Sequence, residues 1–303
     1  MEYAIVKGIE NSLIDLKIDF FYTTRAENDN FRDKKHFDNI LKELQNNFIK
    51  CGLAIVSWMK NQNWFTNATK ILVDRLPDSE GVEGIVTDIR LIIKYMNGAE
   101  STKEISLKHN HDALKHPRLP RLPDQCGISD LSLKEDYIKK HDIIWDEFFI
   151  KAKNLKKDST KFSEVKAIDD NIIDNYLYEP LINLVKDFLL TNANNKRNAT
   201  KFFQFLTSHI NFYVIKNETD QIVIKYFIDI TPPSSFTITY PFNGKKTTCL
   251  IKFDNKWDVT MRLHTASSEY YRNGKINKST KFDVICTNID SVINIETVKK
   301  PTL

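Results

Sequence analysis

Two apolar segments separated by an Asn-Gly pair constrain this chain more than any other stretch. The first, GVEGIVTDIRLII, begins at Gly81, and the second, TKEISLK, leads into the cationic string HNHDALKHPRLPR. Asn-Gly is a favoured sequence for a tight hairpin turn. We therefore predict that residues 88–95 and 102–108 pair as a hairpin across the turn at 97–98.

The polar residues of this hairpin are of types that suit phosphodiester hydrolysis. Asp88 lies at the start of the first strand, and we expect it opposite Lys108 at the end of the second. Alternate side chains of a strand share a face, so Glu104 and Ser106 would lie on the face of Lys108. A carboxylate can hold a divalent metal, and a lysine can orient water or stabilise charge on phosphorus.

The hairpin resembles the PD-(D/E)xK nuclease core, with Asp88 as the acid and Lys108 as the lysine. The triplet Ser106-Leu107-Lys108 has serine where that pattern has an acid. The resemblance implies that Mg²⁺ is bound by Asp88 and a second carboxylate, and that Ser106 takes part in the catalytic set. Candidates for the second carboxylate are Glu83 and Glu104, followed by Glu80 and Asp112.

Two longer strings are similar to HaeIII-type type II restriction endonucleases. One is SLKHNHDALKHPRL, residues 106–119; the other is WDVTMRLHTASS, residues 257–268, followed by KFDV, residues 281–284. The resemblance implies Mg²⁺-dependent cleavage of double-stranded DNA at a short GC-rich palindrome, GGCC. It also implies pairing with a DNA methyltransferase and allows a homodimer.

The same strings supply the candidates for DNA contact, which are cations, imidazoles and small polar side chains. They are His109, Asn110, His111, Lys115, His116, Arg118, Arg121, Arg262, His264, Ser267, Ser268 and Lys281. The alternative is that these residues form a solvated linker and a solvated loop. The histidines of the first string could also hold zinc, although zinc sites usually show pairs of Cys or His at short spacing.

Charge and motifs narrow the function without deciding it. The 303 residues carry a formal net charge of +4, so only local clusters of cations indicate a nucleic-acid partner. The sequence has no P-loop, dinucleotide fingerprint or nucleophile elbow. Two alternatives to a restriction enzyme stay open: another PD-(D/E)xK nuclease, of repair or junction type, and a non-catalytic DNA-binding protein.

The sequence also predicts the compartment. Four cysteines lie far apart, the N-terminus is unlike a signal peptide, and no apolar run is long enough for a membrane span. We therefore expect a cytoplasmic protein with reduced thiols.

The pattern of the whole chain predicts a mixed α+β fold, with a PD-(D/E)xK-like core sheet flanked by helices and a C-terminal, mostly antiparallel β region. We divide it into a nuclease core over 1–125, a helical region over 126–200 and a β-rich recognition region over 201–303. Helical periodicity favours helices over 3–22, 33–60 and 131–190, and a short helix before the strands of the C-terminal region. Short helices are also expected to begin at Asn63 and Asp112.

Overall fold

The computed structural model describes residues 1–77, 85–109 and 112–302. The chain forms two compact units, each assembled from segments distant in sequence. Unit 1 comprises Met1–Asp112, Ile210–Ile230 and Ile293–Leu303, and unit 2 comprises Ala113–His209 and Thr231–Val292. The chain thus leaves unit 1 twice and returns to it twice, whereas the sequence divided it into contiguous regions.

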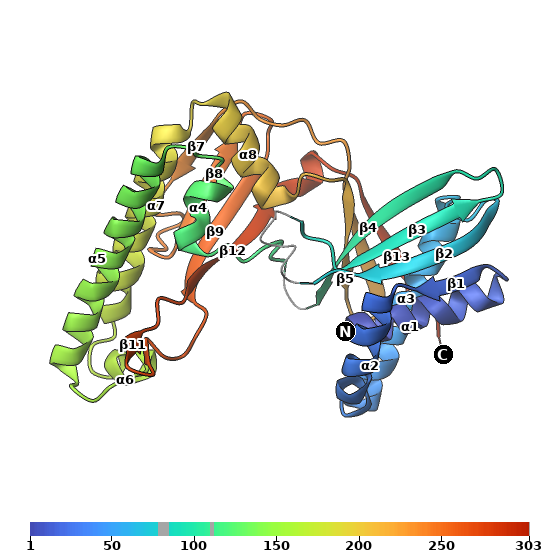
Figure 1. The fold of residues 1–303 in the computed structure, drawn as a ribbon, viewed down its shortest axis with the longest axis horizontal. Coiled ribbons are helices and arrows are strands. Elements are labelled where there is room, and N and C mark those ends of the chain that lie inside the picture. Colours follow the sequence, from blue (N-terminus) through green and yellow to red (C-terminus); the bar gives the residue numbers. More distant parts are fainter. Residues whose placement is uncertain (78–84, 110–111, 303) are drawn as a thin grey trace. The chain divides into compact units, whose positions relative to one another are not determined.

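Unit 1 is built on a mixed β-sheet, called here the core sheet (Figure 1). Its seven strands in the described part of the chain lie in the order β1-β2-β3-β4-β5-β6-β13. The pairs β1–β2 and β4–β5 are parallel, and the other neighbours are antiparallel. The strands are β1 (Asp19–Tyr22), β2 (Ala68–Arg75), β3 (Ile89–Tyr95), β4 (Glu100–His109), β5 (Phe212–Asn217), β6 (Gln221–Phe227) and β13 (Ile295–Lys299).

Helices α1 (Glu2–Asp15) and α3 (Lys42–Asn61) pack against one face of the core sheet, and α2 (Thr24–Asp38) lies between β1 and α3 in the chain. Their apolar residues form one cluster with alternate residues of the central strands, among them Leu91, Ile105 and Leu107. Because strand side chains alternate, the intervening residues of β3 and β4 point to the opposite face. The predicted mixed α+β fold, with a large sheet flanked by helices, is confirmed.

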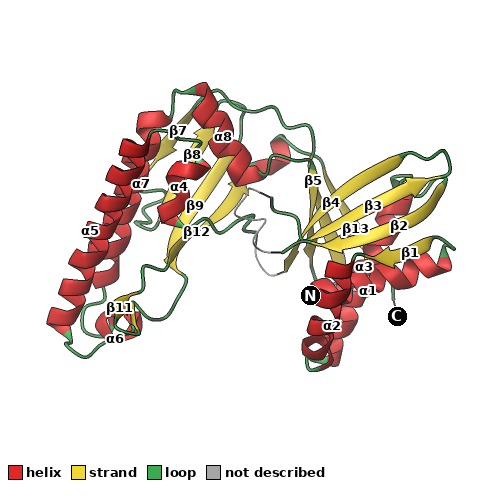
Figure 2. Cartoon of the chain, in the orientation of Figure 1, coloured by secondary structure: helices red, strands yellow, loops and turns green. Residues whose placement is uncertain are grey.

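Unit 2 combines long helices with a second sheet (Figure 2). Among its described residues, four antiparallel strands lie in the order β12-β9-β8-β7. They are β7 (Phe236–Thr239), β8 (Thr248–Phe253), β9 (Asp258–Thr265) and β12 (Thr280–Thr287), accompanied by the short pair β10 (Tyr271–Arg272) and β11 (Lys275–Ile276). The α-helices are α4 (Leu122–Gln125), α5 (Leu131–Leu155), α6 (Phe162–Lys166), α7 (Glu179–Asn192) and α8 (Lys196–Thr207). Two short 3₁₀-helices, η2 (Leu119–Arg121) and η4 (Ile289–Ser291), and a π-helix, η3 (Asp174–Tyr178), accompany them.

Aromatic packing joins α8 to the second sheet. Phe202 and Phe203 of α8 are buried and contact Phe253 of β8, and Phe202 also contacts Phe236 of β7. This apolar face explains why a short helix precedes the strands, as the sequence predicted. The opposite face of β9 and β12 carries polar residues, because the buried residues of each strand alternate with them.

Several local predictions were wrong. The strands Phe212–Asn217 and Gln221–Phe227 were expected in the C-terminal sheet, but β5 pairs in parallel with β4 and so extends the core sheet. The helix expected to begin at Asn63 is absent: turns lead there into β2, whose alternate residues enter the core. Tertiary pairing overrides local helical preference at such short segments.

The segment that begins at Asp112 is also not helical. Its residues run beside β12, with bridges joining Lys115 to Val284 and Arg118 to Lys281. The predicted helix over 3–22 ends at Asp15 and gives way to β1, whereas the predicted helical stretch over 33–60 divides into parts of α2 and α3. No described helix is long and apolar enough to cross a membrane.

Helices α1 and α3 approach each other closely at two glycines, Gly8 and Gly52. A methyl group on Gly52 would lie 2.8 Å from the Cα of Gly8 and closer still to the carbonyl oxygen of Ile5. Both neighbours are backbone, so neither can move without shifting a helix. The absence of a side chain at Gly52 therefore sets the spacing of the helical layer that covers the core sheet.

We expect Gly52→Ala to lower the free energy of unfolding by about 1–3 kcal/mol, because overpacking forces the two helices apart. Urea denaturation of the purified protein measures this difference. Ser57→Ala, at an exposed position of the same helix, is the matched control and should change stability by less than about 0.5 kcal/mol. Equal stability of Gly52→Ala and the wild type would contradict this packing.

Candidate active site

The predicted hairpin is present and forms the centre of the core sheet. Strands β3 and β4 pair antiparallel, with Ile89 opposite Ile105 and Arg90 opposite Glu104. The turn lies between Tyr95 and Glu100, and its Gly98 has a φ of +80°, a conformation that glycine adopts without strain. The hairpin therefore fixes which polar residues of the two strands share the face away from the helices.

Asp88 lies just before β3 and is held by β4. Its backbone N–H donates to the carbonyl of Ile105 at 2.9 Å. Its carboxylate Oδ2 accepts hydrogen bonds from the Leu107 backbone N–H at 2.5 Å and from Ser106 Oγ at 3.2 Å. The register thus places Ser106 opposite Asp88, two residues from the Lys108 that we expected there. Ser106, the residue that departs from the nuclease pattern, positions the acid directly.

Burial shifts both ionisable groups of the pair toward their neutral forms. It raises the pKa of Asp88 to about 6, and the carboxylate of Glu2 adds to this rise while Lys108 opposes it. It lowers the pKa of Lys108, against the attraction of Asp88 and Glu2. Lys108 is 9% exposed. An acid and an amine whose pKa values approach each other are suited to transfer protons.

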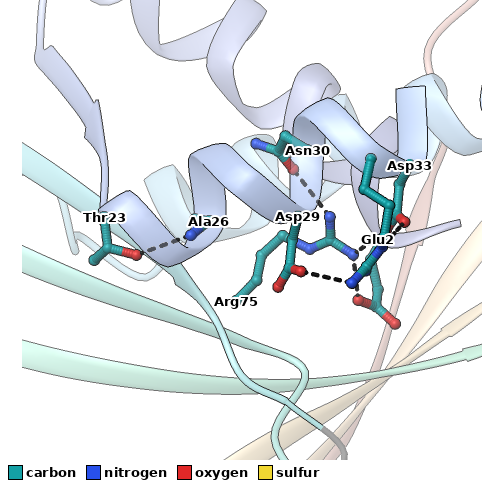
Figure 3. Close-up of polar contacts among 8 residues, drawn as sticks. Glu2, Thr23, Ala26, Asp29, Asn30, Asp33 and Arg75 are labelled. Carbon is teal, nitrogen blue, oxygen red and sulfur yellow. Dashed lines mark hydrogen bonds and ion pairs between the residues drawn. The ribbon is translucent and has the colours of Figure 1, made fainter. Parts of the chain in front are cut away.

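Glu2 is a carboxylate at this site that the sequence analysis missed. It lies in the first turn of α1 and accepts an ion-paired hydrogen bond from Arg75 at 2.7 Å (Figure 3). Arg75 is buried and also donates to Asp33 at 2.7 Å and to Asn30 at 3.1 Å. Acidic residues are common in the first turn of a helix, so no local signal in the sequence distinguishes Glu2 from other acids at such positions.

A polar cavity of about 290 Å³ opens beside these charges. It is lined by Met1, Glu2, Asp29, Arg32, Asp33, Arg75, Leu76 and Pro77. The backbone N–H of Leu76 donates to the carbonyl of Asp88 at 3.0 Å, which ties the wall of the cavity to the hairpin. The polar lining makes this space suitable for water, ions or phosphate oxygens rather than for an apolar ligand.

Glu104 lies one row further along the same sheet face. Asp74 of β2, Arg90 of β3 and Glu104 of β4 are cross-strand neighbours in register. Arg90 Nε donates to Glu104 Oε1 at 2.5 Å. Asp74 accepts from Thr23 and Arg25 instead. The other predicted metal ligand, Glu83, and the weaker candidate Glu80 lie outside the described residues.

The cationic string after β4 is divided between the two units. His109 lies in unit 1, at a groove of about 590 Å³ that Asn47 and Asn217 also line, and its ring contacts Phe48. Asn110 and His111 lie outside the described residues. Asp112 forms an ion pair with Lys216 at 3.0 Å, again in unit 1.

The remainder of the string belongs to unit 2. Lys115 is buried, donates to the Phe205 carbonyl at 2.6 Å and has its pKa lowered by burial to about 7. Lys115 is therefore an internal side chain of unit 2 and not an exposed cation. Arg118 and Arg121 are exposed, as a phosphate or base contact requires.

The C-terminal candidates lie on or next to the second sheet. Arg262 and His264 share the polar face of β9, and Lys281 of β12 is the cross-strand neighbour of His264. Ser267 and Ser268 follow in the turn after β9, where Ser267 Oγ accepts from the Glu269 backbone N–H at 3.1 Å. The structure therefore brings the two strings together in unit 2: the first runs along β12, and the second forms β9.

Comparisons with known proteins show which family the chain belongs to. The model of the HaeIII restriction endonuclease family matches residues 1–231. The type II restriction enzyme HaeIII of Haemophilus aegyptius is 25% identical over 241 residues, which span 70% of this chain and 69% of that protein. The chain also matches a crystal structure of the restriction endonuclease MspI in complex with its cognate DNA. The match covers 64% of this chain and 75% of the MspI chain, at 15% sequence identity and a TM-score of 0.29. That score is too low to define a common fold.

The family match over most of the chain places it among the restriction endonucleases, enzymes that bind and cleave DNA. Within that class, the chain belongs to the HaeIII restriction endonuclease family. Enzymes of this family typically depend on a divalent metal. The resemblance seen in the sequence is thereby confirmed.

The raised pKa of Asp88 makes stability depend on pH. The carboxyl pKa rises from 3.8 to about 6 on folding, so its ionised form destabilises the native state as pH increases through this range. We expect Asp88→Asn to be more stable than the wild type at pH 8 by about 1–3 kcal/mol, with no difference near pH 4. Urea denaturation in EDTA at pH 4, 6 and 8 measures this.

Asp146→Asn, at an exposed position of α5, is the matched control and should show no such pH-dependent gain. If Asp88→Asn were less stable than the wild type at pH 8, ionisation of Asp88 would carry no penalty in the folded protein.

Proposed function

We propose that this chain is a Mg²⁺-dependent type II restriction endonuclease that cuts both strands of DNA at GGCC. The observation that carries the proposal is the placement of Asp88, Ser106 and Lys108 on one sheet face, in a chain of the HaeIII family. The choice of GGCC rests on the likeness of the two sequence strings to that family. Membership of the family supports DNA cleavage, and the site residues support where it occurs.

The oxygen donors at Asp88 fit a hard divalent cation. Carboxylates of Asp88, Glu2 and Glu104 and the hydroxyl of Ser106 are ligands of the type that Mg²⁺ prefers. Asp88 also has too little positive charge around it to offset its burial, which is why its pKa is raised. When bound, Mg²⁺ would neutralise charge on the scissile phosphate and make water more acidic. Asp88 would be its principal ligand, with Glu2 or Glu104 as the second carboxylate.

The protein groups divide the remaining work. Lys108, buried and with a lowered pKa, would hold the attacking water and take up or return a proton. In its charged form it would stabilise the additional negative charge on phosphorus. Ser106 and the Leu107 N–H fix the Asp88 carboxylate, so the acid is positioned before DNA arrives.

DNA contact is proposed for the exposed and half-buried members of the two strings. Arg118 and Arg121 would reach phosphates or guanine edges, for which arginine is the commonest partner. Ser267, Ser268 and Lys281 would contact DNA from the second sheet and its following turn, and His109 from the end of β4. Arg262, His264, His116 and Lys115 would contribute less, because all four are engaged within unit 2.

A palindromic site cut on both strands is most simply matched by a two-fold homodimer. We propose such a dimer as the working state. A DNA methyltransferase acting on the same sequence would protect the host genome, and both enzymes would work in the cytoplasm, where the DNA is.

We expect the wild type to cut unmethylated phage DNA into discrete fragments with MgCl₂ of about 10 mM, in line with the weak binding of Mg²⁺ by open sites. Asp88→Ala and Lys108→Ala should reduce the cleavage rate by about 1,000-fold or more, and EDTA should abolish cleavage. Ser106→Ala should lose less, about 10-fold, because the Leu107 N–H still holds Asp88. Gel electrophoresis gives the rates, and sequencing of the fragment ends gives the site.

Lys94→Ala, at an exposed position on the same hairpin, is the matched control and should cut at the wild-type rate. A smear instead of bands would indicate a structure-selective or non-specific nuclease. Binding of DNA without any cleavage by folded wild type would indicate a non-catalytic DNA-binding protein. Fragment ends at another sequence would contradict only the proposed recognition of GGCC.

DNA binding by Arg118 and Arg121 can be measured in the absence of DNA cleavage. The double variant Arg118→Ala/Arg121→Ala should bind a GGCC duplex more weakly, and its log Kd should depend on log salt with a slope reduced by about two. Fluorescence anisotropy in EDTA over a series of salt concentrations measures both. Lys139→Ala, which removes an exposed cation on α5, should leave the slope unchanged. An unaltered slope in the double variant would remove both arginines from the interface.

A further inference from the structure

A second polar cluster lies in unit 2, and its members come from three distant parts of the sequence. His264 is on β9 and Asp283 on β12, with Asp283 directly opposite Arg262 in the antiparallel register. His116 reaches the same point because the segment that contains it runs beside β12. Backbone hydrogen bonds from Val284 N–H to Lys115 and from Phe282 N–H to Pro117 hold that segment in place.

The two imidazoles converge on one oxygen of the carboxylate. His116 Nδ1 lies 2.8 Å and His264 Nε2 2.9 Å from Asp283 Oδ1. The other oxygen, Oδ2, accepts from Arg262 at 2.6 Å. The three ligating atoms of His116, His264 and Asp283 all lie within 4.8 Å of one another.

Both ring nitrogens of His264 face oxygen atoms. Nδ1 lies 3.0 Å from the carbonyl oxygen of Thr265, which can only accept a hydrogen bond, and Nε2 lies 2.9 Å from Asp283 Oδ1. The tautomer with its proton on Nδ1 satisfies the carbonyl and directs the lone pair of Nε2 at the carboxylate. A metal ion between Nε2 and the carboxylate oxygen would take both atoms as ligands.

We propose that His116, His264 and Asp283 bind a divalent transition-metal ion, Zn²⁺ in the first instance. Two imidazoles and one carboxylate are a ligand set that zinc accepts, with the next position open to water or another oxygen. Ligands on tetrahedral zinc with bonds of about 2.0 Å lie about 3.3 Å apart. Each imidazole nitrogen would therefore move about 0.4–0.5 Å further from Asp283 Oδ1, and the separation of the two nitrogens, within 4.8 Å here, would adjust to the same spacing.

The surroundings of the cluster resemble those of a metal site. The hydrogen bond from Nδ1 of His264 to the Thr265 carbonyl fixes the ring and its tautomer, as outer partners of metal-bound histidines do. The side chain of Asp283 is 12% exposed, whereas that of His116 is 42% exposed, so the ion would be held from beneath and open on one side. Arg262 would remain on the outer oxygen, where it limits the affinity by charge repulsion.

This site is separate in residues and in chemistry from the one at Asp88. Imidazole nitrogens favour zinc, nickel and copper, whereas carboxylate and hydroxyl oxygens favour magnesium. Zinc at the cluster would also fix the segment around His116 against β12. The exposed Arg118 lies on that segment, and its bridge to Lys281 would be held with it.

The test is a metal titration of the full chain without DNA. We expect the wild type to bind about one Zn²⁺ per chain by isothermal titration calorimetry, with MgCl₂ of about 10 mM present to occupy weak oxygen sites. With Co²⁺ in place of Zn²⁺, visible absorption should report nitrogen and oxygen ligands. His264→Ala and Asp283→Ala should weaken binding by about 100-fold or more.

Three further variants show whether the ion binds at this cluster. Asp88→Ala should bind Zn²⁺ as the wild type does, which distinguishes the cluster from the proposed catalytic site whatever becomes of cleavage. His36→Ala, which removes an exposed histidine from α2, should also bind normally. His264→Gln keeps a polar side chain at the position but should lose the metal, and its unfolding transition shows whether unit 2 still folds.

Two results would overturn the proposal. One is the absence of Zn²⁺ binding by folded wild type at pH 7.5. The other is equal Zn²⁺ affinity in the wild type and in folded His264→Ala and Asp283→Ala, which would place the ion elsewhere on the chain.

Discussion

The alternation of side chains along the β3–β4 hairpin is the constraint on which unit 1 depends. Leu91, Ile105 and Leu107 enter the core beneath α1 and α3, so the residues between them must point away from it. The same backbone that buries Leu107 uses its N–H to hold the carboxylate of Asp88. Packing and site geometry are thus set by one strand pairing, and a shift of register by one residue would exchange the apolar face for the polar one.

Burial changes the ionisation of Asp88 and Lys108. In water Asp88 would be ionised and Lys108 charged at neutral pH. Burial raises the pKa of Asp88 and lowers that of Lys108, so the two values approach each other. The nearby carboxylate of Glu2 raises the pKa of Asp88 further. Arg75 holds Glu2 in place through an ion pair and forms a second ion pair with Asp33. The buried carboxylate of Asp88 lowers the stability of the folded chain when it is ionised. A metal ion bound to Asp88 would offset this loss of stability.

In unit 2 the pairing of an irregular segment with β12 has the corresponding role. Pro117 limits any helix that begins at Asp112, and the chain up to Arg118 lies instead along the edge of the second sheet. That pairing brings His116 to Asp283, which β9 and β12 have already placed beside Arg262 and His264. The polar cluster of unit 1 is thus built mainly on one local hairpin, whereas that of unit 2 joins residues from distant parts of the chain.

The sequence by itself determined the hairpin, the mixed α+β class and the family, because turn residues, alternation and fixed motif spacing are local signals. It could predict that Asp88 lies close to the end of the second strand, since one hairpin holds Asp88, Ser106 and Lys108. It could not find Glu2 or the joining of His116 with His264 and Asp283, since no local pattern relates residues so far apart. Nor could it assign β5 and β6 to the core sheet. Only the tertiary structure decided these, because strand pairing between distant segments depends on which edges remain free after the local elements have formed.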